Sequence, residues 1–245
     1  MALIEGKGVS KAFGALRAVD QVDFHIESNE ILGLIGPNGA GKTTLVNLIT
    51  GVYPVTEGEI SFKREKITGL RPARVSRLGI ARTFQIVKPF PGMTVRENVV
   101  IGALFGKNGA GRSTRAAFQE ADRWIDYVHL QDHRYASVDQ INISDRKRMD
   151  LAKALAMGPE LLMLDEVMAG LNTDETREVI GLVQSVSRRL NIGVGVVEHV
   201  MGVIRELTHR VIVLENGEII AAGPYEEVSR NPRVIEAYLG GAASC

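Results

Sequence analysis

The first fifty residues alternate between short apolar runs and polar turns, a pattern typical of β-strands. Two runs, over 22–26 and 31–35, are rich in β-branched side chains and are separated by a polar stretch over 27–30, so we expect two strands. After a glycine-rich turn, Leu45, Leu48 and Ile49 recur at helical spacing. The order at the start of the chain is therefore strand, glycine loop, helix.

The middle of the chain is predicted to be mostly helical, because its apolar residues recur at helical spacing. Strands are expected over 58–63 and 80–84, with a short basic helix over 71–78 between them. Thr94 followed by Glu97 has the form of a capping box, which predicts that a helix begins there. Further helices are expected over 116–128 and 144–156.

The last third alternates between strands and helices. Apolar runs over 161–164, 192–197 and 211–214 predict strands, and a hairpin turn is expected at Asn216 and Gly217. Asn172 and Glu175 are placed to open a helix after the first of these strands. The alternation predicts an α/β protein, with a mixed sheet, flanking helices and an antiparallel β region near the N-terminus.

We expect one domain over residues 1–245. Within it, residues 1–88 and 159–245 are predicted to form the core lobe, and residues 89–158 an inserted α-helical subdomain.

Composition narrows the range of functions. Hydrophobic residues make up 45% of the chain, enough for a full core, and 29 basic residues balance 29 acidic ones, which disfavours a nucleic-acid partner. The single cysteine, Cys245, excludes an intrachain disulfide and fits a reducing compartment. The apolar runs fall well short of the roughly 20 residues that span a bilayer, so we do not expect the chain to cross a membrane itself.

A phosphate-binding motif, GPNGAGKT, lies between the expected strand and helix. Its glycines permit backbone conformations in which successive amides point at phosphate oxygens, and the positive end of the next helix adds to the attraction. We expect the lysine to bridge the β- and γ-phosphates of ATP and the first threonine to ligate Mg²⁺. The alternative, a glycine turn with an incidental lysine, is disfavoured by the flanking strand and helix. The expected ATP-binding residues are Gly36, Pro37, Asn38, Gly39, Ala40, Gly41, Lys42, Thr43 and Thr44.

Two carboxylates follow the apolar run over 161–164. Ligands of open α/β sheets bind at the carboxyl ends of the strands, so Asp165 is expected to hold Mg²⁺. Glu166 is expected to orient and deprotonate the water that attacks the γ-phosphate. By itself such a pair is more often a solvated turn or a helix start, but the upstream phosphate loop favours the catalytic interpretation. Together the two motifs predict a P-loop nucleotidase core.

Three further positions, in this order and spacing, give the chain a resemblance to the ATP-binding-cassette ATPases over nearly its whole length. They are Gln85 in ARTFQ, AGLN just beyond the acidic pair, and His199 in VVEH. The resemblance implies that Gln85 contacts the metal and couples to a membrane domain, and that His199 senses the γ-phosphate. It also implies that Ala169, Gly170, Leu171 and Asn172 form the loop that meets a partner cassette.

Each of these positions also has a purely structural explanation. Taken singly, Gln85 could be a surface residue, Asn172 a helix cap and His199 a helix-start residue. The resemblance further implies that Phe13 stacks on adenine, whereas the alternative is a core phenylalanine.

The chain departs from the family at the signature, which is close to LSGGQ and binds the γ-phosphate held by the other cassette. The corresponding residues are Ile141, Asn142, Ile143, Ser144 and Asp145. Ile143 and Asp145 are expected to crowd or repel phosphate. We therefore hypothesise an asymmetric pair, in which this chain's own phosphate loop hydrolyses ATP and the reciprocal site mainly binds it. The alternative is an accepted variant with full activity.

The surroundings MTVRENV, DEVMAGLN, VVEHVMGVI and NPRVIEAYLG resemble ATPase subunits of branched-chain or hydrophobic amino acid uptake systems. The resemblance implies integral membrane permease subunits, a second ATPase subunit (a heterodimer rather than a homodimer) and an extracytoplasmic solute-binding protein as partners. It places the chain peripherally on the cytoplasmic face of the inner membrane. The alternatives are a lipid or lipopolysaccharide exporter cassette, a non-transport cassette acting on DNA or ribosomes, and a metabolic kinase.

Overall fold

The computed structural model describes residues 2–83 and 87–240. The chain divides into two compact units, the first made of Met1–Pro72 with Gly193–Cys245 and the second of Ala73–Ile192. No helix within the described ranges is long and apolar enough to cross a membrane.

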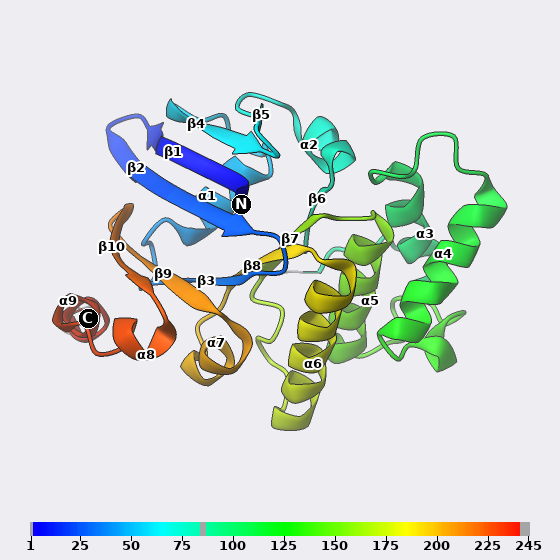
Figure 1. The fold of residues 1–245 in the computed structure, drawn as a ribbon. Coiled ribbons are helices and arrows are strands. Elements are labelled where there is room, and N and C mark those ends of the chain that lie inside the picture. The colour runs from blue at the N-terminus through cyan, green and yellow to red at the C-terminus, as the bar shows by residue number, and fades with distance from the viewer. Residues whose placement is uncertain (1, 84–86, 241–245) are drawn as a thin grey trace. The chain divides into compact units, whose positions relative to one another are not determined.

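The first unit opens with an antiparallel sheet in the order β2-β1-β4-β5. Figure 1 shows β1 and β2, in blue, running side by side. On β2 the side chains of Val22, Phe24 and Ile26 are buried while those between them are exposed, the alternation expected of a strand with one face on the core. The strands are β1 (Ala2–Phe13), β2 (Leu16–Glu27), β4 (Glu57–Phe62) and β5 (Glu65–Lys66).

The first unit also contains four strands in the order β10-β9-β3-β8. β3 is parallel to both β8 and β9, and β10 is antiparallel to β9. β3 and β8 are buried along their whole length, as the continuous apolar runs predicted. These strands are β3 (Ile31–Ile35), β8 (Gly193–Val197), β9 (Arg210–Glu215) and β10 (Glu218–Gly223), and the helices of this unit are α1 (Lys42–Ile49), α7 (Met201–Leu207), α8 (Tyr225–Val228) and α9 (Pro232–Gly240).

The second unit is mainly helical, and its helices α3, α4 and α5 pack on one another. Buried apolar side chains on these helices include Val99, Ala117, Trp124 and Leu155. β6 and β7 form a parallel pair in register from Ile80 opposite Leu161. The elements are α2 (Pro72–Leu78), β6 (Ile80–Arg82), α3 (Val95–Phe105), α4 (Thr114–Tyr127), the 3₁₀ turn η1 (Gln131–His133), α5 (Ile143–Ala156), β7 (Leu161–Asp165) and α6 (Thr173–Leu190).

The predicted fold class is confirmed: an antiparallel N-terminal sheet accompanies parallel strands with flanking helices. β1 was not predicted from the sequence. It carries Lys7, Lys11 and two glycines, and its pairing with β2 is interrupted by register shifts, so its side chains do not alternate cleanly. The expected helical subdomain over 89–158 contains α3, α4 and α5, and its boundaries stay a prediction.

Candidate nucleotide site

The phosphate loop joins β3 to α1, and its backbone requires glycine at two positions. Gly36 has a φ of 146°, and a Cβ there would lie 2.0 Å from the carbonyl oxygen of Leu214. Gly41 has a φ of 102°, and a Cβ there would lie 2.3 Å from the carbonyl oxygen of Ala18. Any side chain at either position would displace the loop from its contacts with β2 and β9.

Lys42 folds into this loop rather than extending into solvent. Its side-chain nitrogen donates to the carbonyl oxygens of Gly36 (2.7 Å) and Pro37 (2.8 Å). Lys42, Thr43 and Thr44 form the first turn of α1, so one cation and two hydroxyl groups stand at the positive end of the helix. This donor set suits a polyphosphate anion, and Asn38 and Thr43 are exposed.

The turn of the β9–β10 hairpin is hydrogen-bonded to the phosphate loop. The amide of Gly217 donates to the carbonyl oxygen of Ala40 (3.1 Å), and the carbonyl oxygen of Gly217 accepts from the amide of Asp20 (2.8 Å). The sequence predicted the turn at Asn216 and Gly217 but not this second role, because nothing local indicates which loop a hairpin turn will contact.

Phe13 lies at the end of β1 with 43% of its surface exposed, so it is not a core side chain. Its ring meets that of Tyr53 edge to face, with centroids 5.3 Å apart and planes at 81°. The ammonium group of Lys11 lies 4.9 Å from the Phe13 centroid and donates to the carbonyl oxygen of Pro54 (2.9 Å). The ring is thus held from two sides and remains accessible for stacking.

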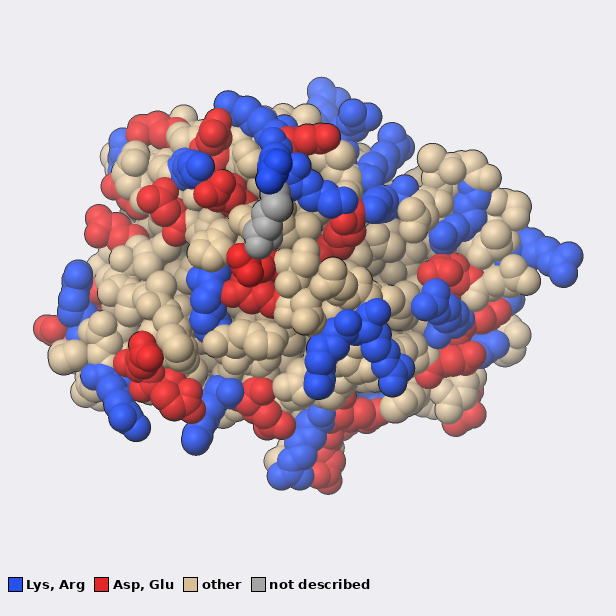
Figure 2. Space-filling view, viewed as in Figure 1, with Lys and Arg blue, Asp and Glu red and all other residues tan. Residues whose placement is uncertain are grey.

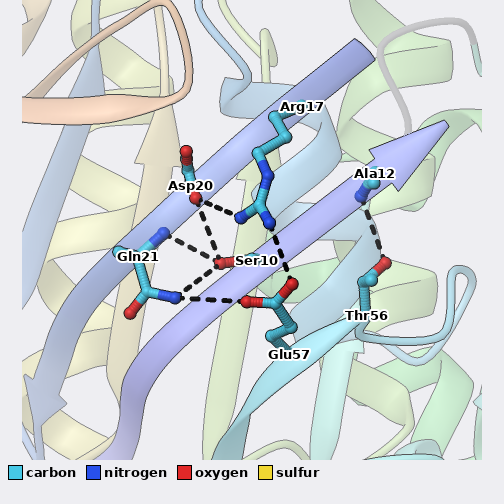
Figure 3. A network of polar contacts seen from close by, with 7 residues as sticks. All are labelled: Ser10, Ala12, Arg17, Asp20, Gln21, Thr56 and Glu57. Carbon is cyan, nitrogen blue, oxygen red and sulfur yellow. Dashed lines mark hydrogen bonds and ion pairs between the residues drawn. The ribbon is translucent and has the colours of Figure 1, made fainter. Parts of the chain in front are cut away.

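A network of polar contacts joins β1, the strand that ends at Phe13, to β2 and to residues at the start of β4 (Figure 3). Arg17 of β2 donates to Asp20 (2.7 Å) and to Glu57 of β4 (2.9 Å), and the hydrogen bond to Asp20 is the main cause of the raised pKa of Arg17. The amide of Ala12, next to Phe13, donates to the hydroxyl of Thr56 (3.1 Å). One side of the β1–β2 turn is therefore hydrogen-bonded to Glu57 at the start of β4, and the other to Thr56, the residue just before it.

In the second unit, the two predicted carboxylates lie at the end of β7: Asp165 is its last residue and Glu166 follows it. Asp165 is 1% exposed and accepts a hydrogen bond from the guanidinium of Arg82 on β6 (2.8 Å), and Arg82 is itself only 10% exposed. Glu166 follows in the left-handed region with a φ of 51°, a strained backbone for a residue with a side chain. The sequence analysis did not identify Arg82 as the partner of Asp165. The feature that could have indicated it is the position of Arg82 at the end of a strand parallel to β7.

The segment after Glu166 ends in a helix cap. The side-chain oxygen of Asn172 accepts from the amides of Asp174 and Glu175 (both 3.0 Å), and the Glu175 carboxylate accepts from the amide of Asn172 (2.9 Å). The prediction that Asn172 and Glu175 open a helix is therefore confirmed, and the structure shows that they form a capping box. Ala169 and Gly170, upstream of the cap, are exposed and accessible to a partner.

The divergent segment 141–145 forms the start of α5. Asn142 caps the helix by accepting from the amide of Asp145 (2.8 Å), and Ile143 presents 67% of its surface to solvent. Ile141, Ser144 and Asp145 are buried. The Asp145 carboxylate lies 2.9 Å from Nδ1 of His133 on η1, a partner that sequence reasoning did not identify.

The remaining predicted residues are His199 and Gln85. His199 follows β8 and is exposed, and it belongs to the first unit together with Phe13 and the phosphate loop. Asp165, Glu166 and the segment 141–145 belong to the second unit. Gln85 lies outside the described residues.

Comparison with known proteins identifies the family of the chain. The family model described as ABC transporter matches residues 19–169, the stretch from β2 through the phosphate loop to the loop after Glu166. The chain belongs to the ABC transporter ATPase family. It is thus an ATP-binding cassette that hydrolyses ATP, and the resemblance seen in the sequence is confirmed.

Proteins that match this ABC ATPase over nearly its whole length are named as ATP-binding proteins of transport systems. It is 36% identical over 251 residues to the high-affinity branched-chain amino acid transport ATP-binding protein LivG of Salmonella typhimurium, with 98% of each chain covered. It is 35% identical, with the same coverage, to the corresponding protein BraF of Pseudomonas aeruginosa. A second family model, the branched-chain amino acid ATP-binding cassette transporter, matches residues 218–244.

Solved structures show the same fold. A nucleotide-free ATP-binding cassette from an ABC transporter has a TM-score of 0.88 at 27% identity, covering 97% of this ABC ATPase and 99% of that chain. The ADP conformation of an ATP-binding cassette of an ABC transporter has a TM-score of 0.87 at 27% identity, covering 98% and 99%.

Proposed function

We propose that this ABC ATPase powers the uptake of branched-chain or other hydrophobic amino acids or related amides. The observation that carries the proposal is the match of residues 218–244 to a family model specific for branched-chain amino acid cassettes. This stretch comprises β10, α8 and α9, which lie beyond the catalytic motifs shared by all cassettes.

The proposed assembly contains two membrane permease subunits, a second cassette and an extracytoplasmic solute-binding protein. The cassette works peripherally, on the cytoplasmic face of the inner membrane. The full-length similarity to LivG and BraF supports this arrangement, because both are named as ATP-binding proteins of transport systems.

The nucleotide contacts are assigned to the residues that the sequence predicts. Phe13 stacks on adenine, and the amides of 36–43 with Lys42 hold the phosphates. Mg²⁺ prefers hard oxygen ligands, and the proposed ligands are Thr43, Asp165 and Gln85. Within the described residues, no group of three or more His, Cys, Asp or Glu side chains could hold a metal ion elsewhere. Bound Mg²⁺ would supply positive charge that offsets the negative charge of the phosphates.

Glu166 is the proposed general base. It accepts a proton from water as the water oxygen bonds to the γ-phosphorus, and the bond from that phosphorus to the bridging oxygen of ADP breaks. His199 contacts the γ-phosphate, and Ala169 to Asn172 meet the partner cassette. The exposed Ile143 at the start of α5 supports the asymmetric pair, because a bulky side chain stands where the family has glycine.

The test is transport by the reconstituted complex. The chain is co-expressed with its neighbouring permease and cassette genes, placed in proteoliposomes, and supplied with the solute-binding protein and labelled leucine. We expect ATP-dependent uptake that is abolished by Lys42→Ala, which removes the phosphate-binding ammonium. Failure of leucine, isoleucine, valine and simple amides to accumulate would reject the assigned solute class. Export of labelled lipid would favour an exporter instead.

A further inference from the structure

Lys147 occupies an unusual position for a lysine. It lies on α5, two residues after the segment 141–145, and only 7% of its surface is exposed. Burying an ammonium group is costly unless hydrogen bonds replace its water. Lys147 must therefore be compensated by contacts within the protein.

Its ammonium group meets the backbone that follows β7. It donates to the carbonyl oxygen of Glu166 (3.2 Å) and to the carbonyl oxygen of Ala169. The amide of Ala169 donates to the same Glu166 oxygen (3.3 Å), which closes the turn. Two carbonyl groups at the two ends of one turn thus share a single cation, and hydrogen bonds from charged donors are stronger than those between neutral groups.

This turn connects the two parts of the proposed mechanism. At one end is Glu166, whose backbone is in the left-handed region, and at the other is the exposed segment that begins at Ala169. A strained backbone persists only where its surroundings hold it in place. The contacts of Lys147 are placed to provide that support from α5.

We propose that Lys147 is a positioning residue that couples the start of α5 to the Glu166–Ala169 turn. A shift of α5 when segment 141–145 engages the nucleotide of a partner cassette moves the ammonium group, and the two carbonyl groups move with it. Glu166 is then oriented for catalysis only when α5 is engaged. The inference rests on the proposed role of Glu166 as the general base.

The test compares Lys147→Met with Lys147→Arg in the assembled transporter. Methionine has a similar length but no N–H donor, so we expect kcat to fall about 10- to 100-fold, the size of effect that a displaced catalytic group produces. KM for ATP should change less than about twofold, because the two carbonyl groups that accept from Lys147 belong to the turn after β7 and not to the chain's own phosphate loop. The Hill coefficient for ATP should fall toward 1, and Lys147→Arg should restore most of both quantities.

Lys153→Met is the matched control. Lys153 lies on the same helix and pairs with the buried Asp150 (2.5 Å), so its loss also removes an ammonium group from a buried partner. It should lower the melting temperature and leave kcat and the Hill coefficient near wild type. Should Lys147→Met fail to fold, Lys147→Gln is measured instead. Its amide nitrogen is one bond closer to the backbone than the lysine ammonium group and carries no charge, so kcat and the Hill coefficient should fall partway toward the values expected for Lys147→Met.

Unchanged kcat and Hill coefficient in a folded Lys147→Met or Lys147→Gln protein would overturn the inference. So would equal losses in the Lys147 and Lys153 variants, since these would indicate general destabilisation. Glu166→Gln, measured in parallel, separates the two proposals: if it abolishes turnover while Lys147→Met keeps the wild-type kcat and Hill coefficient, the general base stands and the coupling role fails.

Discussion

Glu166 combines a half-buried carboxylate with a left-handed backbone at the end of a fully buried strand. Local strain of this kind is retained where function requires a particular side-chain direction. Its neighbour Asp165 has a different environment, since it is buried and held by Arg82. Adjacent carboxylates thus meet different surroundings, which suits one to a fixed ligand role and the other to proton transfer.

Glu166→Gln should retain ATP binding and lose at least about 100-fold in kcat, because glutamine has a similar shape but cannot accept the proton of water. Binding is measured with a fluorescent ATP analogue and turnover by phosphate release. Glu160→Gln is the control, since Glu160 pairs with Lys107 just before the same strand. Wild-type turnover in Glu166→Gln would remove Glu166 from the role of general base.

Arg82→Met should destabilise the protein by about 3–5 kcal/mol, because it leaves the buried Asp165 carboxylate without its guanidinium partner. Adding Asp165→Asn should recover part of the loss, and urea unfolding of the two single variants and the double variant gives the coupling energy. Strictly additive effects would show that the ion pair contributes nothing specific.

At the scale of elements, α3 begins at a capping box that makes its stability depend on pH. The amide and the hydroxyl of Thr94 both donate to the Glu97 carboxylate (2.8 Å each), and the backbone hydrogen bond is the main cause of the lowered pKa of Glu97. A carboxyl group whose pKa is lower in the folded state stabilises the fold above its unfolded pKa, and this stabilisation is lost as pH falls through the folded value.

Thr94→Ala should therefore cost about 1 kcal/mol at neutral pH, as is typical for the loss of an N-cap. Glu97→Gln should flatten the fall in melting temperature between roughly pH 5 and pH 3, where the wild-type carboxylate becomes protonated. Thermal melts of wild type and both variants across this range are the measurement. Parallel pH profiles for wild type and Glu97→Gln would contradict the assignment.

The elements that the sequence predicted are those with local causes. The capping residues at Thr94 and Asn172, the glycines around Lys42 and the hairpin turn at Gly217 each encode their structure within a few residues. Contacts between distant segments were not predicted. The Arg82–Asp165 pair joins residues 83 positions apart, and Lys147 reaches Ala169 across 22 positions, so their side chains meet only after the fold is formed.

At the scale of the whole molecule, the charges are mixed. Basic and acidic side chains are interspersed over the face drawn in Figure 2, in keeping with the balance of 29 basic and 29 acidic residues. A binder of nucleic acid usually gathers its basic residues on one face. The balanced composition is the basis for expecting no nucleic-acid partner, and this stays a prediction.

An asymmetric pair of cassettes has a simple kinetic consequence. In the assembled transporter, Glu166→Gln in this chain should remove nearly all turnover, while the equivalent change in the partner cassette should leave most of it. The reason is that the partner's nucleotide faces the segment 141–145, where Ile143 and Asp145 replace the family residues. Steady-state ATPase assays of the two single-site complexes provide the comparison, and equal losses would reject asymmetry.

The hydrogen bonds of Gly217 link the C-terminal hairpin to the phosphate loop and to β2. Such a link acts in both directions: whatever orders the loop must also slow the opening of the turn, by the same free energy. Amide hydrogen exchange at Gly217 would then be a reporter of nucleotide occupancy, read from a residue that need not touch the ligand. The hairpin turn that leads into residues 218–244 would sense whether ATP is present.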